Sequence, residues 1–250
     1  MTAGVPQPAD APKPKGRQIY KMRVVQIRDY TRRIRELFLK CEEPAEFQFR
    51  AGQFVMLHVP TEPKPALRAY SIASSDHRHD GFRLIFNHIE NGLASNFVWA
   101  LKGGELLDFT GPFGRLFFNE PPLQQIVMLS TGSGISQHAC YLESNLRKYP
   151  DLRYRVLMGL RTESDIYYHS ELDALKREFK DFDYEFVLSR AGSSWSGKKG
   201  YVQHFIQDFS FQETPTTFYL CGNSGMIKDV KARLAQDAFD AKQILAEAFD

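Results

Sequence analysis

Four neighbouring residues, Arg68-Ala69-Tyr70-Ser71, combine side chains that suit a planar, phosphorylated cofactor. They follow an apolar run and a proline-rich turn, and on an extended strand Arg68 and Tyr70 would share one face. A guanidinium grips phosphate oxygens, an aromatic ring stacks on a planar ring system, and a serine hydroxyl reaches a ring nitrogen. The tetrapeptide alone fits an edge strand with a surface arginine equally well, so other motifs must decide.

A second candidate phosphate site is Gly92-Leu93-Ala94-Ser95, at the start of an expected helix over residues 91–101. Free backbone N–H groups at a helix start bind anions, and small residues let a phosphate approach closely. Serine is also a common helix cap, and a plain capping role for Ser95 is the commoner explanation of such a pattern taken alone.

The third motif is Ser130-Thr131-Gly132-Ser133-Gly134-Ile135, placed directly after an apolar strand and opening a helix. A strand, a glycine-rich turn and a helix are the context that a dinucleotide-binding loop requires. Two glycines among hydroxyls favour phosphate binding over an ordinary turn, although the full GxGxxG pattern is absent.

Two further motifs follow later strands. Ser189-Arg190, with Lys198-Lys199-Gly200-Tyr201 downstream, places hydroxyls and cations where ligands of a parallel sheet sit, which suits a ribose 2′-phosphate. A solvated basic loop is an equally good interpretation of the charge. Cys221-Gly222, before a helix start at residue 224, fits either packing or contact with a bound ring.

Composition sets the outer limits on function. The 250 residues are 43% hydrophobic and 25% charged with a net charge of +2, so no global field favours nucleic acid as a partner. The three cysteines lie too far apart for a metal site or an iron–sulfur cluster, and no apolar run approaches the ~20 residues of a membrane span. We therefore expect a cytoplasmic protein without a metal. Residues 17–40 are rich in Lys and Arg, which predicts either a solvated strand face or a docking surface for an acidic partner.

The hydrophobic pattern changes in the middle of the chain. Residues 1–17, rich in Pro and Ala, are expected to be a disordered leader. Short β-type runs over residues 18–120 predict an antiparallel barrel interrupted by one helix. After Pro121-Pro122, strands at 125–130, 155–160, 184–188, 217–221 and 243–249 alternate with helices at 135–148, 170–179, 201–208 and 224–239. This alternation over residues 121–250 predicts a five-stranded parallel sheet with helices on both faces.

The order of these motifs resembles the ferredoxin–NADP reductase family over about residues 18–250. The resemblance implies a Greek-key barrel that binds FAD, followed by a Rossmann-like domain that binds NAD(P). It implies FAD contacts at Arg68, Ala69, Tyr70, Ser71, Ile85, Phe86, Asn87, His88, Gly92, Leu93, Ala94 and Ser95. It implies NADP contacts at Thr131, Gly132, Ser133, Ser189, Arg190, Lys199, Tyr201, Gln203, Cys221, Gly222 and Met226, with Phe249 stacked on the flavin.

The activity that the resemblance implies is hydride transfer between NADP(H) and FAD, with single electrons exchanged with a ferredoxin or flavodoxin. Ser71, Cys221 and Glu247 would shape the contact between the two rings. The segment 195–202 is similar to NADH-using reductases of oxygenase systems, so an NADH-dependent reductase component is the alternative. A slow-turnover electron-transfer subunit of a larger complex is a further one.

Overall fold

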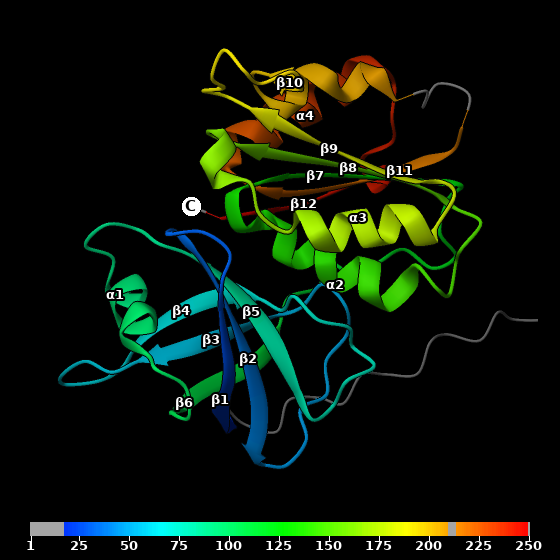
Figure 1. Cartoon of the computed structure of the whole chain (residues 1–250). Helices are drawn as coiled ribbons and strands as arrows, with labels where there is room; N and C mark the ends of the chain where they lie inside the picture. Colours follow the sequence, from blue (N-terminus) through cyan, green and yellow to red (C-terminus); the bar gives the residue numbers. More distant parts are fainter. Residues whose placement is uncertain (1–17, 210–213, 250) are drawn as a thin grey trace, which may run out of the picture.

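The computed structural model describes residues 18–209 and 214–249, which form an antiparallel sheet followed by a parallel sheet (Figure 1). The predicted fold class, a β-barrel joined to an α/β unit, is confirmed. The expected leader, residues 1–17, lies outside the described residues. A domain boundary at Pro121-Pro122 stays a prediction.

The antiparallel sheet closes into a barrel. Its strands are β1 (Ile19–Asp29), β2 (Ile34–Glu43), β3 (Phe54–Val59), β4 (Ala66–Ser71), β5 (Gly81–Asn87) and β6 (Leu106–Phe113), in the order β4-β3-β6-β1-β2-β5. Helix α1 (Leu93–Ala100) follows β5. Val55, Leu57 and Val59 alternate inward along β3, as a half-buried strand requires. The edge strands β4 and β5 meet where the rings of Tyr70 and Phe86 lie 4.4 Å apart.

The second sheet is parallel throughout. Its strands are β7 (Gln125–Thr131), β8 (Arg153–Leu160), β9 (Phe182–Leu188), β10 (Lys198–Lys199), β11 (Thr216–Gly222) and β12 (Ile244–Ala248), in the order β10-β9-β8-β7-β11-β12. The α-helices are α2 (Ile135–Asn145), α3 (His169–Glu178) and α4 (Ser224–Gln236). Short 3₁₀ segments are η1 (Gly132–Gly134), η2 (Glu163–Asp165), η3 (Val202–Asp208) and η4 (Ala241–Gln243). The central strand β7 is buried from Gln125 to Ser130, because helices cover both of its faces.

Two details differ from the expected elements. The segment expected as a helix at 201–208 is the 3₁₀ helix η3, whose tighter winding suits a short connector. The sheet also gains β10, which pairs Lys198 and Lys199 with Val187 and Leu188. A strand of two residues is too short to show any alternation of apolar and polar residues, so it could not be predicted from the pattern.

The two sheets share one packed core. In Figure 1, α2 and α3 lie between the parallel sheet and the barrel, while α4 lies on the other face. Buried residues of the barrel, such as Leu84, belong to the same apolar cluster as Leu142 of α2 and Leu172 of α3. A second cluster joins α4 and η3 to the sheet. Among the described residues no helix has both the length and the apolar character needed to cross a membrane.

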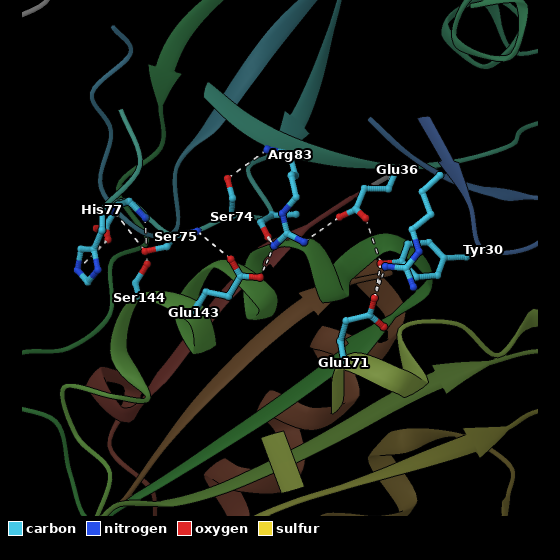
Figure 2. Close-up of polar contacts among 12 residues, drawn as sticks. Tyr30, Glu36, Ser74, Ser75, His77, Arg83, Glu143, Ser144 and Glu171 are labelled. Atoms are coloured by element: carbon cyan, nitrogen blue, oxygen red, sulfur yellow. Dashed lines mark hydrogen bonds and ion pairs between the residues drawn. The ribbon is translucent and has the colours of Figure 1, made fainter. Parts of the chain in front are cut away.

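Arg83 forms the first half of a polar contact between barrel and α/β unit (Figure 2). Its guanidinium on β5 donates to Glu36 Oε1 at 3.2 Å, to the carbonyl of Ala73 at 2.8 Å, and to Glu143 on α2. The backbone N–H of Ser75 also donates to Glu143 Oε2, at 3.2 Å. The barrel therefore holds α2 through a guanidinium that is itself 13% exposed.

Tyr30 forms the second half, at α3. Its hydroxyl lies 3.1 Å from Glu36 Oε2 and 3.0 Å from Glu171 Oε1, and Arg28 pairs with the same Glu171. Burial raises the pKa of Glu36, against the pull of Arg83, because the carboxylate is fully enclosed. We call these six residues the interface cluster: Arg28, Tyr30, Glu36, Arg83, Glu143 and Glu171.

Candidate active site at the junction of barrel and sheet

A cavity of about 710 Å³ opens where the barrel meets the carboxyl ends of the parallel strands. It is called the central cavity below. Ten residues predicted from the sequence line it: Asn87, Thr131, Gly132, Ser133, Ser189, Tyr201, Gln203, Gly222, Met226 and Phe249. These residues are scattered over more than 160 positions of the chain, and the fold brings them to the lining of one cavity. The size suits a nucleotide ligand.

The turn from Thr131 to Gly134 lines the cavity with its first three residues. Gly132 has φ +55°, and a Cβ atom there would meet nothing within 4 Å, so the turn faces open space. At Gly134 a Cβ would lie 2.2 Å from the carbonyl oxygen of Cys221, so this glycine allows α2 to start against β11. The turn therefore presents backbone at a helix start to the cavity, the arrangement that binds pyrophosphate.

A second turn, from Gly222 to Met226, lies beside the first. Gly222 has φ +136°, and its missing Cβ would stand 2.2 Å from Thr131 Oγ1. Thr131 Oγ1 accepts the N–H of Asn223 at 2.9 Å, which ties the two turns together. Asn223 Oδ1 then caps α4 by accepting from Gly225 N at 2.9 Å and Met226 N at 3.3 Å.

The far end of the cavity contains the polar groups that follow β8 and β9. Arg161, directly after β8, lines the cavity beside Ser189. Arg190 and Lys199, predicted to hold a 2′-phosphate, are exposed and do not line it. The ammonium of Lys199 lies 3.3 Å from the carbonyl of Gly192 instead. In the described chain, Arg161 is thus the cation that meets the cavity at this end.

Acidic groups also reach this end of the cavity. Asp165 is held by its own turn, because its Oδ2 accepts from the N–H and hydroxyl of Thr162 at 3.0 and 2.8 Å. Asp229 accepts from Gln203 Nε2 at 3.1 Å. Both carboxylates therefore have donors before any ligand is considered.

The first motif lies at the edge of the barrel on β4, outside the lining of the central cavity. Arg68 is exposed, and the contact described for its guanidinium is with the carbonyl of Leu67 at 2.9 Å. Tyr70 is partly buried against Phe86, and this burial raises its pKa to about 12. Ser71 is 7% exposed. An exposed guanidinium beside a phenol ring that packs on Phe86 fits the pyrophosphate and the planar ring of a flavin dinucleotide.

The predicted strand and helix start beside β4 have mixed roles. Ile85 and Phe86 are core residues, 2% and 1% exposed, so a cofactor would reach only their backbone. Asn87 is exposed at the cavity. Ser95 closes the preceding loop, because its hydroxyl accepts from Ile89 N at 2.9 Å and lies 3.4 Å from the carbonyl of Asn87. Its side chain makes no cap for α1, whose N-cap is Gly92.

The remaining predictions at this helix differ in exposure. Leu93 is 41% exposed and Ala94 is 6% exposed. His88 packs edge-on against Trp99 with ring centroids 4.9 Å apart. Ala69 is exposed on β4. The start of α1 thus combines a small buried residue, Ala94, with the exposed residue Leu93.

The predicted catalytic residues near the chain's last strand are largely enclosed. Cys221 is fully buried and does not line the cavity, and burial raises the pKa of its thiol far above the ordinary value. Burial also raises the pKa of Glu247, although Gln137 donates to its carboxylate. Glu247 pairs in register with Cys221 across β11 and β12. Phe249 does reach the cavity, with its N–H donating to the carbonyl of Gly222 at 2.9 Å.

Sequence reasoning missed several residues of this wall. Arg161 stands one residue past a parallel strand, so the rule that ligands sit at strand ends could have found it. Asn223 follows β11 in the same way. Arg33 comes from the barrel turn between β1 and β2, and its guanidinium lies 3.3 Å from the carbonyl of His88. Nothing in its local sequence shows that this turn faces the second sheet.

Comparison with known proteins identifies both halves. Residues 21–118 match the oxidoreductase FAD-binding domain, and residues 128–232 match the oxidoreductase NAD-binding domain. The ferredoxin–NADP reductase B of Sorangium cellulosum (strain So ce56) is 34% identical over 221 residues, which cover 85% of this chain and 89% of that relative.

Two other relatives extend the comparison. The phenol 2-monooxygenase reductase component DmpP of Pseudomonas sp. (strain CF600) is 28% identical over 238 residues, and the match covers 92% of this chain but 65% of that relative's length. A solved ferredoxin NADP⁺ reductase from Neisseria gonorrhoeae, with bound FAD and NADP, superposes with a TM-score of 0.80 at 22% identity, covering 92% of this chain and 98% of that one. By its two domain matches and its 34% identical relative, the chain belongs to the ferredoxin–NADP reductase family of flavin-dependent oxidoreductases.

Proposed function

We propose that this oxidoreductase oxidises NADPH with FAD as its cofactor and passes electrons singly to a ferredoxin or flavodoxin. The observation that carries the proposal is the central cavity, whose wall combines the Thr131–Gly134 turn, the Gly222–Met226 turn and Arg161. The first two suit a pyrophosphate and a nicotinamide, and the third suits a 2′-phosphate.

The residues of β4 and α1 are proposed to hold FAD. Arg68 has an exposed guanidinium that is free of any described ion pair, and Tyr70 offers a ring fixed by Phe86. The start of α1 offers backbone N–H groups to phosphate. When bound, FAD supplies the redox chemistry, since a flavin accepts hydride and can release electrons one at a time.

The buried groups near Phe249 are proposed to exclude water from the reacting centre. Phe249 covers part of the cavity beside Gly222, so a nicotinamide that enters there has to displace its ring. Cys221 pairs in register with Glu247 on the strands beside it, and burial raises the pKa of both groups. Ser71 is proposed to contact the flavin edge from β4.

The acceptor is proposed to be an acidic electron-transfer protein. Of the basic residues within 17–40 that could dock it, several are already engaged in ion pairs. Arg23, Arg28 and Arg35 are paired with Glu42, Glu171 and Asp29. Among the described residues, no ion pair is found for Arg32 and Lys40, which are exposed. If they contribute to docking, reversing both charges should slow ferredoxin reduction and flatten its salt dependence, while NADPH oxidation with a small artificial acceptor stays unchanged.

The decisive experiment is stopped-flow reduction of the flavin at 450 nm by NADPH and by NADH, on wild type, Arg161→Ala and Arg190→Ala. The proposal expects NADPH to be preferred, and the preference to fall about tenfold or more in Arg161→Ala, as loss of one charge-assisted contact implies. Arg190→Ala is the matched control, because Arg190 is exposed but outside the cavity lining. Protein that cannot take up FAD would contradict the whole assignment.

A second candidate is an NADH-dependent reductase component of an oxygenase system. Asp165 and Asp229 at the far end of the cavity favour it, since carboxylates there suit ribose hydroxyls and repel a 2′-phosphate. In that case NADH should reduce the flavin faster than NADPH, and Arg161→Ala should leave the ratio unchanged.

A further inference from the structure

Tyr167 is a buried residue, 2% exposed, that the function described so far does not use. Its hydroxyl donates to the carbonyl oxygen of Gly132 at 2.8 Å. Gly132 lines the cavity and is the first residue of the short 3₁₀ segment η1, where its φ of +55° lies in the left-handed region that favours glycine. The hydrogen bond therefore restrains the orientation of one peptide unit in the nucleotide-binding turn.

The orientation of that peptide unit decides whether a backbone N–H or a carbonyl oxygen faces the cavity. In a trans peptide the C=O of one residue and the N–H of the next point in opposite directions. Because the carbonyl of Gly132 is turned to Tyr167, which does not line the cavity, the N–H of Ser133 points away from Tyr167, and Ser133 itself lines the cavity. The opposite orientation would aim a carbonyl dipole at an incoming phosphate.

Tyr167 is in turn held by the interface cluster. Its ring lies 5.6 Å from the ring of Tyr30, whose hydroxyl contacts Glu36 and Glu171. The next residue, Tyr168, has φ +61°, an uncommon conformation for a bulky side chain, and it lies 6.0 Å from Tyr30. This kink just before α3 directs two successive tyrosines into the junction, and strained backbone of this kind collects at functional positions.

We propose that Tyr167 is a positioning residue for the nucleotide: its hydroxyl, steadied by the ring of Tyr30, fixes the Gly132–Ser133 peptide so that the Ser133 N–H faces the cofactor's pyrophosphate. The inference rests on the proposed function, because it assumes that a pyrophosphate-containing nucleotide occupies the central cavity. If Tyr167 acts in this way, the packing of the barrel against the α/β unit directly affects the affinity for the nucleotide.

The test uses Tyr167→Phe, which removes one hydroxyl and keeps the ring. NADP⁺ and NAD⁺ are each titrated into flavin-loaded protein by calorimetry. The dissociation constants for both should rise about threefold to tenfold, the loss expected for one net hydrogen bond. Because both nucleotides carry the pyrophosphate, the ratio of the two constants should stay at its wild-type value.

Tyr154→Phe is the matched control. Tyr154 is 1% exposed, and its hydroxyl donates to the carbonyl of Tyr149 at 3.3 Å near the start of β8, the end of the strand away from the cavity. The melting temperature of Tyr154→Phe should fall about as much as that of Tyr167→Phe, while its nucleotide dissociation constants stay at the wild-type values. Amide hydrogen exchange over residues 132–134 of the nucleotide-free protein should accelerate in Tyr167→Phe and not in Tyr154→Phe.

The possible results distinguish a failure of the proposed function from a failure of the positioning role of Tyr167. Wild-type protein that binds neither nucleotide would refute the proposed function itself. Wild-type protein that binds, with Tyr167→Phe matching it in both affinity and amide exchange, would overturn the positioning role alone. An equal loss of affinity in the Tyr154→Phe control would also overturn it, because the effect would then be a general consequence of losing a buried hydroxyl.

Discussion

Replacing Arg83 with methionine should destabilise the protein far more than loss of an ordinary surface charge. Arg83 holds Glu36, which is 0% exposed, and once the guanidinium is gone the hydrogen bond that remains to the carboxylate among the described residues is from the hydroxyl of Tyr30 at 3.1 Å, with the charge of Arg28 nearby. Removing one partner of a buried pair typically costs about 3–5 kcal/mol, because the other charge is left without compensation. The bond to Glu143, which is 36% exposed, adds about 0–1 kcal/mol.

The measurement is urea unfolding at pH 7, followed by circular dichroism and by flavin release. Arg78→Met is the matched control, since Arg78 pairs with Asp80 at 3.3 Å and both are more than half exposed. That change should cost about 0–1 kcal/mol. A second variant, Arg83→Met with Glu36→Gln, should recover much of the loss by removing the buried charge.

The same reasoning predicts how the loss depends on pH. Burial already raises the pKa of Glu36 above its ordinary 4.5, and removing Arg83 should raise it further. The folded protein then binds a proton that the unfolded chain releases, so lowering the pH stabilises the folded state. The deficit of Arg83→Met should shrink by up to about 1.4 kcal/mol per pH unit as the pH falls from the folded pKa of Glu36 in the variant to the lower folded pKa of Glu36 in the wild type. Equal losses in Arg83→Met and Arg78→Met, or a deficit that grows on acidification, would refute this account.

Two further changes test the site. Gly222→Ala should lower the free energy of unfolding by roughly 2–4 kcal/mol and weaken nucleotide binding. The added Cβ would fall 2.2 Å from Thr131 Oγ1, in a backbone conformation disfavoured for alanine. Thermal melting measures the first effect and NADP⁺ titration the second. The thiols of Cys41, Cys140 and Cys221 should resist a disulfide reagent at pH 8 for as long as the protein stays folded, because all three are buried. Burial also raises the pKa of Cys41 to about 11 and of Cys140 to about 12, which disfavours the reactive thiolate. Three thiols should react after unfolding, and rapid native labelling would contradict the buried placement.

The fold was largely predictable because periodicity is a local property. The alternation along β3 and the continuous apolar run of β7 identify a half-buried and a fully buried strand from a few residues each. Short elements escape such reasoning, and β10, with two residues, depends wholly on its pairing with β9. Boundaries moved as well: α2 ends at Asn145, three residues before the expected end.

Contiguous motifs identified part of the cavity lining from the sequence, and their roles in binding stay predictions. The turn from Thr131 to Ser133 and Ser189 stand at strand ends, and all of these residues line the cavity. Which arginine reaches the cavity depends on the direction of its side chain, which the sequence does not show. Arg161 lines the cavity and Arg190 does not. The roles of Arg33 and Tyr167 depend on how two sheets pack together, and no local pattern encodes a contact across the junction.

The strand order of the barrel constrains how the chain can fold during synthesis. Strands β4 and β3 form one half of the sheet, β1, β2 and β5 form the other, and β6 joins them by a strand ladder on each side, pairing with both β3 and β1. At the usual 5–20 residues per second, the ribosome needs roughly 5–20 s to extend the chain from Ile19 to Phe113. During that time β1 and β3 each present an open edge to other nascent chains. Substitutions that slow translation within residues 88–106 should therefore lower the yield of soluble protein without altering the stability of the finished molecule.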